Sequence, residues 1–276
     1  MSGSLAQHAD EGLTAEPSIE LSIEHRDVII VGAGLSGIGA ACHLAEKCPD
    51  RSYLLLESRK AMGGTWDLFR YPGIRSDSDM HTLGYSFKPW EGAKAIADGP
   101  SILDYVRETA AEHAVDQHIR YGHRLLSASW SSEQSIWTLE IRQSDSDKTV
   151  QMTCNFLYMC SGYYSYETPH DPKFPEIASF KGQVIRPQFW PEDLDYQDKT
   201  VVIIGSGATA MTLVPAMAKK AKQVTMLQRS PTYVLSRPSE DWFANGLRKI
   251  MPSSWAYAVT RFRNTLFQEF LFKQAR

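Results

Sequence analysis

Two glycine-rich loops are the segments of this sequence whose residue types and spacing indicate chemistry. The first has the pattern GxGxxG and includes Gly32, Gly34, Ser36 and Gly37. The second consists of Gly205, Ser206, Gly207, Ala208, Thr209 and Ala210, with alanine in the place of the last glycine. Glycines in this pattern let the backbone approach a pyrophosphate, which the positive end of a following helix stabilises. We therefore expect two dinucleotide-binding loops; a tight turn without a ligand is the alternative.

The residues that follow the two loops differ in charge. Glu57 and Arg229 stand at nearly the same offset from Gly32 and Gly205, and Ser230 follows Arg229. A carboxylate accepts hydrogen bonds from the free ribose hydroxyls of FAD or NAD, whereas a guanidinium binds a 2′-phosphate through two parallel hydrogen bonds. The sequence thus predicts FAD or NAD at the first loop and NADP at the second. A solvated loop charge is the alternative for Arg229.

Short apolar strands and helical segments position these loops. Each loop follows a strand and precedes a helix and a second strand. In the first unit we expect the strand at 27–31, the helix at 38–47 and the second strand at 53–56. In the second unit we expect them at 200–204, 211–220 and 223–227. Each set has the pattern of a βαβ unit. The expected fold class is therefore α/β, with two Rossmann-like dinucleotide-binding domains.

The remaining segments suggest how the chain divides. A helix begins at Ser101, with Ser101 and Asp104 as a capping pair, and short strands fill residues 124–159. A proline-rich connection follows. We expect a flexible acidic tail at 1–24, the N-terminal part of an FAD-binding domain at 25–165, a linker at 166–198, and a partial NADP-binding domain with a helical tail at 199–276.

Composition excludes several classes of protein. A net charge of −3 gives no general electrostatic basis for binding nucleic acid. A signal peptide has a basic start and an apolar run, and the first 24 residues contain no Lys or Arg and no apolar run. No stretch of the sequence approaches the length of about 20 apolar residues that a transmembrane helix needs. We therefore expect a cytoplasmic protein. Four cysteines form no C-x-x-C pair, so we expect no metal site, and a disulfide reductase is disfavoured.

Two dinucleotide loops in one chain indicate an electron relay from NADPH to a bound flavin. Disulfide reductases and flavin monooxygenases share this arrangement, and the cysteines favour the monooxygenases. Residues 62–79, MGGTWDLFRYPGIRSDSD, resemble the flavin-contacting segment of class B flavoprotein monooxygenases. They are most similar to the Baeyer–Villiger branch that includes thioamide-prodrug activators and alkane-degradation enzymes. The second loop and residues 228–233 resemble the NADP half of that family.

The resemblance implies an FAD- and NADPH-dependent monooxygenase. NADPH would reduce FAD, the reduced flavin would capture O2 as a C4a-(hydro)peroxide, and one oxygen atom would enter a small-molecule ketone or be added to sulfur. The implied FAD contacts are Ser36, Glu57, Thr65, Trp66, Asp67, Leu68, Asp77 and the backbone near Leu125. The implied NADP contacts are Arg75, Ser76, Asp77, the loop from Gly205 to Met211, Arg229 and Ser230.

Two positions of the resemblance would be catalytic, Asp77 and Arg186. Asp77 matches the aspartate that orients a catalytic arginine over the flavin; the alternative for Asp77 and Asp79 is a polar loop that caps its own turns. The family signature F-x-G-x-x-x-H-x-x-x-W-P reads FKGQVIRPQFWP from Phe180, so Arg186 replaces the histidine. Because a fixed cation then replaces a titratable ring, we expect weakened coupling between NADPH binding and flavin chemistry. An exposed linker charge is the alternative for Arg186.

The resemblance also implies that the closing half of both domains, with the catalytic arginine, lies beyond this sequence, so we expect a truncated chain. The alternatives to an active monooxygenase are a non-catalytic remnant that binds FAD and NADP, and an uncoupled NADPH oxidase. From Arg237 onward, apolar residues form broad helical faces: Trp255, Tyr257, Val259, Phe262, Leu266, Phe267, Phe270 and Leu271. Such a helix could lie on a membrane surface or be an insertion whose packing partner is missing.

Overall fold

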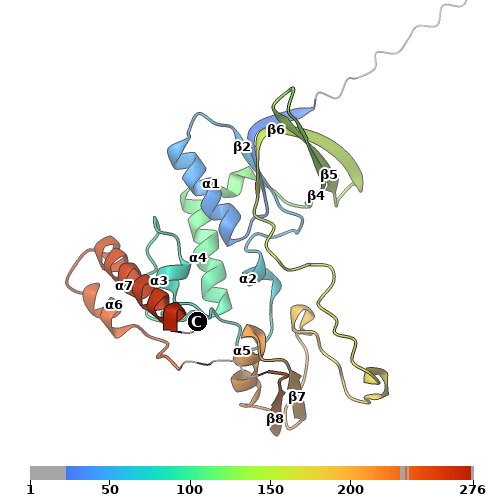
Figure 1. Ribbon diagram of the computed structural model, residues 1–276, viewed down its shortest axis with the longest axis vertical. Helices are drawn as coiled ribbons and strands as arrows, with labels where there is room; N and C mark the ends of the chain where they lie inside the picture. The colour runs from blue at the N-terminus through green and yellow to red at the C-terminus, as the bar shows by residue number, and fades with distance from the viewer. Residues whose placement is uncertain (1–22, 231–233, 235, 275–276) are drawn as a thin grey trace, which may run out of the picture.

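A six-stranded sheet organises the first part of the chain, in the order β3-β2-β1-β6-β5-β4 (Figure 1). The computed structural model describes residues 23–230, 234 and 236–274. The strands are β1 (Glu24–Val31), β2 (Tyr53–Leu56), β3 (Ile119–Arg120), β4 (His123–Ser131), β5 (Ile136–Gln143) and β6 (Lys148–Met159). β1 pairs in parallel with β2 and β6, whereas β4, β5 and β6 pair antiparallel. The arrangement confirms the α/β prediction.

Side chains of β1 alternate between two cores, because successive residues of a strand point to opposite faces. Ile30 packs in the core that α1 (Leu35–Lys47) and α4 (Gly99–Glu112) form on one side of the sheet (Figure 1). Ile29 and Val31 pack in the second core, with side chains of β5 and β6. The strand is therefore held between two layers, and the first glycine loop follows it directly.

Several elements begin earlier than the sequence predicts, among them β1, α1 and α4. β1 starts at Glu24, whose carboxylate forms an ion pair with Arg120 at 2.6 Å. The helix predicted from Ser101 is α4, and Asp98 caps it by accepting a hydrogen bond from the Ser101 N–H at 3.0 Å. The predicted Ser101 cap is wrong because the Ser101 hydroxyl itself donates to Asp98. Residues 1–22, most of the expected acidic tail, lie outside the described residues.

A smaller parallel pair forms the second unit. β7 (Thr200–Ile204) and β8 (Gln223–Leu227) flank α5 (Ala208–Met217), as predicted, except that α5 begins and ends earlier than the predicted range of 211–220. Phe69 and Tyr71 of the first part belong to the hydrophobic core of this unit. The segment that follows the first glycine loop therefore contacts both units.

Two helices, α6 (Trp242–Leu247) and α7 (Ser253–Gln274), follow the second unit, and α7 lies against α3 (Met80–Leu83) (Figure 1). Arg261 donates hydrogen bonds to the carbonyl oxygens of His81 and Gly84 at 2.8 Å each. The buried residues of α7 are Ala256, Tyr257, Thr260 and Asn264. One face of α7 thus has a packing partner, while Trp255, Phe262, Phe270 and other large apolar side chains are exposed. No helix among the described residues combines the length and apolar content that a membrane crossing requires.

Gly73 lies where the first part contacts α5. Its φ is +82°, and an added Cβ would stand 2.6 Å from the Thr212 carbonyl oxygen. Gly162 also has a positive φ, +71°, but no described atom lies within 4 Å of its added Cβ. We expect Gly73→Ala to lower the free energy of unfolding by about 1–3 kcal/mol more than Gly162→Ala, because only Gly73 adds a clash to the backbone strain. Urea unfolding measures both; equal losses would contradict the tight contact with α5.

His81 is buried between α3 and α7, and burial holds its pKa below the ordinary value of 6.5. The charged groups that act on it are Asp79, Asp241, Arg248 and Arg263. Below pH 6.5, His81 binds a proton in the unfolded chain more readily than in the folded chain. The stability contributed by neutral His81 is therefore complete above pH 6.5 and is lost as pH falls toward the folded-state pKa.

We expect His81→Leu to flatten the decline in the free energy of unfolding on acidification, by up to about 1.4 kcal/mol per pH unit. Urea unfolding across a pH series measures this slope, with His170→Gln, at an exposed position, as the control. A slope equal to that of the wild type would refute the role of His81.

Candidate dinucleotide-binding site

The first glycine loop requires glycine for steric reasons. Gly32 has φ +106°, and its added Cβ would lie 2.4 Å from the Cys160 carbonyl oxygen, while a Cβ on Gly37 would lie 1.9 Å from the Gly32 carbonyl oxygen. Gly34 is the N-cap of α1 and provides no side chain to cap the helix. The positive end of α1 is therefore open to an anion.

A second pair of glycines extends this loop into a cradle. The Gly63 N–H donates to the Ala33 carbonyl oxygen at 2.9 Å, and a Cβ on Gly64 would lie 3.1 Å from the Gly34 Cα. Gly64 precedes α2 (Thr65–Leu68), the short helix that contains Thr65, Trp66, Asp67 and Leu68. Two backbones meet here without side chains between them, so the residues present fit the close approach of a dinucleotide.

Glu57 lies at the end of β2, where we expect a carboxylate that accepts hydrogen bonds from ribose hydroxyls. It follows β2, is 3% exposed, and accepts hydrogen bonds from the Ala33 N–H on Oε2 and from the Arg59 N–H on Oε1, both at 2.9 Å. The His123 N–H donates to the Glu57 carbonyl oxygen at 2.9 Å, which places the start of β4, and hence Leu125, near this residue. The Ser58 hydroxyl also donates to Oε1 at 3.4 Å, and because a carboxylate has about four acceptor sites, Oε2 can accept a further hydrogen bond.

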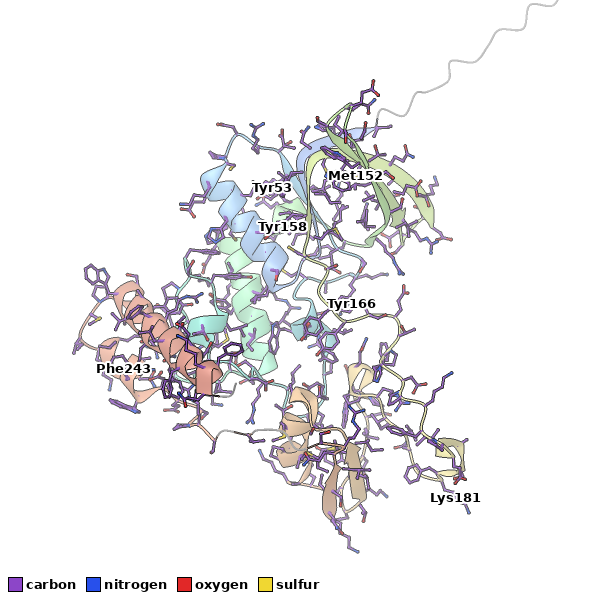
Figure 2. All side chains as sticks on the ribbon, viewed as in Figure 1. Tyr53, Met152, Tyr158, Tyr166, Lys181 and Phe243 are labelled. Carbon is purple, nitrogen blue, oxygen red and sulfur yellow. The ribbon has the colours of Figure 1, made fainter. Side chains whose placement is uncertain are left out.

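Asp67 directs its carboxylate toward guanidinium groups. It is 6% exposed and accepts hydrogen bonds from Arg59, Arg70 and Arg107 at 2.7, 3.2 and 3.1 Å. Arg59 also lies over the ring of Tyr166, with 5.6 Å between the guanidinium carbon and the ring centroid. Figure 2 labels Tyr166 beside α2, where the connection to the second unit begins. Burial raises the pKa of the Tyr166 hydroxyl.

The segment after α2 runs toward the second unit and then to α3. Arg75 and Asp77 are exposed, whereas Ser76 is buried and its N–H donates to the Ala97 carbonyl oxygen at 2.9 Å. Asp79 caps α3 through the Thr82 N–H and accepts a hydrogen bond from Asn264 of α7 at 2.9 Å. For Asp79, the structure therefore favours the turn-capping interpretation.

The second glycine loop is more open. Gly205 has φ +127° and donates to the Leu227 carbonyl oxygen at 2.8 Å, which joins the carboxyl ends of β7 and β8. Gly207 is the N-cap of α5 without a side-chain cap. No described atom lies within 4 Å of an added Cβ on Gly205 or Gly207. Arg229 and Ser230 follow β8 and are exposed, so a guanidinium stands at the same edge as the loop.

The modified signature lies in the connection between the two units. Arg186 precedes the short 3-10 turn Pro187–Phe189 and forms an ion pair with Asp171. The Phe180 ring packs on Gly182, whose added Cβ would lie 2.6 Å from it. The structure therefore pairs Arg186 with a carboxylate inside the connection.

Four residues of the site escaped the sequence analysis: Arg59, Arg70, Arg107 and Tyr166. Arg59 follows Glu57 closely, so its place beside the first loop could have been anticipated. Arg107 is one exposed residue of α4, and Tyr166 stands at the start of the connection. Their proximity arises only when α4 and the connection pack against α2, and no local pattern signals it.

Two uncapped glycine turns, each between a parallel strand and a helix, place the chain in the class of α/β proteins with two dinucleotide-binding units. Residues 30–97 match the family described as NAD(P)-binding Rossmann-like domain. Residues 89–270 match the family described as Flavin-binding monooxygenase-like. This match spans more than half of the sequence, so the protein belongs to the flavin-binding monooxygenase-like family.

Individual relatives agree with this assignment. The protein is 55% identical over 246 residues to FAD-containing monooxygenase EthA of Mycobacterium tuberculosis (strain ATCC 25618 / H37Rv), covering 89% of this chain and 50% of that protein. It is 51% identical over 251 residues to Probable FAD-binding monooxygenase AlmA of Acinetobacter sp, covering 91% and 50%. These matches confirm the resemblance found in the sequence.

A solved structure of an oxidized steroid monooxygenase bound to NADP superposes with a TM-score of 0.69 and 28% identity. The match covers 85% of this chain and 43% of that one. The chain thus spans about half the length of the curated relatives it matches.

Replacing Glu57 tests the integrity of the first loop without any ligand. Glutamine has one carbonyl oxygen, so Glu57→Gln leaves one of the two buried N–H groups, of Ala33 or Arg59, facing an amide NH2. We expect a loss of about 1–3 kcal/mol in the free energy of unfolding. Glu140→Gln, an exposed change on β5, should cost less than about 0.5 kcal/mol. Urea unfolding measures both, and an equal cost would show that the Glu57 hydrogen bonds contribute little.

Proposed function

We propose that this protein binds FAD at the first glycine loop and NADPH at the second, and acts as a monooxygenase on a small ketone or sulfur compound. The observation that carries the proposal is the buried Glu57 carboxylate, held by Ala33 beside the open end of α1. An adenosine ribose would donate hydrogen bonds to it there. FAD, when bound, supplies a ring that accepts a hydride and activates O2. Membership of the flavin-binding monooxygenase-like family supports this assignment.

The residues of the chain would bind and orient the two dinucleotides. Ser36 and the N–H groups at the start of α1 would receive the FAD phosphates. Arg229 and Ser230, exposed at the carboxyl end of β8, would bind the 2′-phosphate of NADPH. Arg75 and Asp77 are exposed on the segment that contacts α5 through Gly73, so they would stand between the two dinucleotides.

A second candidate is a dinucleotide-binding protein that transfers no oxygen to a substrate. The second unit has an open glycine loop, because no described atom lies within 4 Å of an added Cβ on Gly205 or Gly207. Such a unit could bind NADPH weakly and reduce the flavin without protecting the product of its reaction with O2. Uncoupled NADPH oxidation would then release hydrogen peroxide.

A visible absorption spectrum of the purified chain, before and after anaerobic NADPH, tests the proposal. We expect a flavin band that bleaches with NADPH and bleaches more slowly with NADH. Subsequent addition of O2 with a thioether or a ketone, followed by product analysis, separates oxygen transfer from hydrogen peroxide release. A flavin band that persists with NADPH would show that the second loop does not bind NADPH as a hydride donor. A protein that stays colourless after FAD addition would contradict FAD binding as well, and with it the monooxygenase activity.

A further inference from the structure

Three guanidinium groups converge on one buried carboxylate beside the first glycine loop. Arg59 donates to Asp67 Oδ2 at 2.7 Å, and Arg70 and Arg107 donate to Oδ1 at 3.2 and 3.1 Å. The Asp67 side chain is 7% exposed, whereas those of Arg70 and Arg107 are 48% and 46% exposed. The three arginines come from three different segments, so the fold itself assembles this arginine cluster.

Arg59 ties the arginine cluster to the glycine cradle. Its backbone N–H donates to Glu57 Oε1 at 2.9 Å, and its Nη1 lies 3.4 Å from the Gly64 carbonyl oxygen. Gly64 in turn lies against Gly34, the N-cap of α1. The arginine cluster therefore borders the space that the uncapped end of α1 faces.

The charges of the arginine cluster do not balance. Asp67 offsets one guanidinium and the neighbouring Glu57 carboxylate, which is hydrogen-bonded to the Arg59 N–H, offsets a second, so one positive charge remains beside the positive end of α1. Like charges at this separation repel, and a single arginine would suffice to pair Asp67. A pyrophosphate diester carries two negative charges, and the planar guanidinium binds phosphate oxygens through paired hydrogen bonds. A dinucleotide pyrophosphate therefore has the sign of charge and the hydrogen-bonding geometry that the arginine cluster can bind.

We propose that Arg59, Arg70 and Arg107 bind the pyrophosphate of a dinucleotide, and that Asp67 is a positioning residue that holds the three guanidiniums. This inference rests on the proposed function, because it names how the same site takes its ligand. It differs from the direct FAD contact that the family resemblance implied for Asp67. Both carboxylate oxygens of Asp67 already accept hydrogen bonds from arginine, and the side chains of Arg70 and Arg107 are accessible to solvent.

The test compares Arg59→Gln, Arg70→Gln and Arg107→Gln with the control Arg142→Gln, whose exposed guanidinium pairs only with Asp147 among the described residues. FAD and NADP+ are titrated separately into the full chain, by flavin fluorescence and by calorimetry. We expect each variant of the arginine cluster to raise a dissociation constant about tenfold or more, and this difference to shrink at high salt. The control should bind like the wild type.

Arg107→Lys is a second variant that separates weakened binding from misfolding. Lysine keeps the positive charge of Arg107 but cannot form two parallel hydrogen bonds. We expect it to bind more weakly than the wild type and more tightly than Arg107→Gln. Weakened FAD binding assigns the arginine cluster to the flavin dinucleotide, and weakened NADP+ binding alone assigns it to the nicotinamide dinucleotide. If the variants bind both like the wild type, the inference is overturned while the proposed function stands. If the wild type binds neither FAD nor NADP+, the inference and the proposed function are both overturned.

Discussion

A buried carboxylate held by two backbone N–H groups is the interaction on which the first loop depends. Glu57 accepts hydrogen bonds from Ala33 in the loop and from Arg59 after β2. Its own N–H donates to the Arg120 carbonyl oxygen, and its carbonyl accepts from His123. Burying a charge is unfavourable unless hydrogen bonds replace water, and here the two bonds from backbone N–H groups also fix the backbone at both ends. One residue thus joins the glycine loop, β2, β3 and β4.

The segment from Gly63 to Gly84 extends this organisation to the rest of the molecule. Gly63 donates to Ala33, Gly73 fits against α5, and Asp79 binds Asn264 of α7. The proline-rich connection therefore separates two parts of the sequence without separating two packed bodies. The segment therefore contacts the first glycine loop at Gly63 and the helix that follows the second glycine loop at Gly73.

Local patterns predicted the two βαβ beginnings because alternation of strand residues and glycine spacing are properties of neighbouring residues. The same patterns could not identify the Asp98 cap, since Ser101 offers an equally suitable side chain three positions later. These patterns also do not predict that Arg107 contacts Asp67, or which face of α7 is buried. Tyr257 and Asn264 pack because α3 lies beside them, whereas Phe262 and Phe270, which are more apolar than Asn264, are exposed. Tertiary contacts decided each of these cases.

The signature around Arg186 separates structural from chemical requirements. Trp190 packs with the core of the second unit, and the Phe180 ring occupies the space that Gly182 leaves. These contacts position the connection whatever residue stands at 186. Arginine places a guanidinium where the family signature has an imidazole, and the two side chains differ in shape and in the hydrogen bonds they form. Its ion pair with the exposed Asp171 contributes about 0–1 kcal/mol. Arg186 therefore changes the polar side chain of the signature, whereas the apolar contacts of the signature come from Phe180 and Trp190.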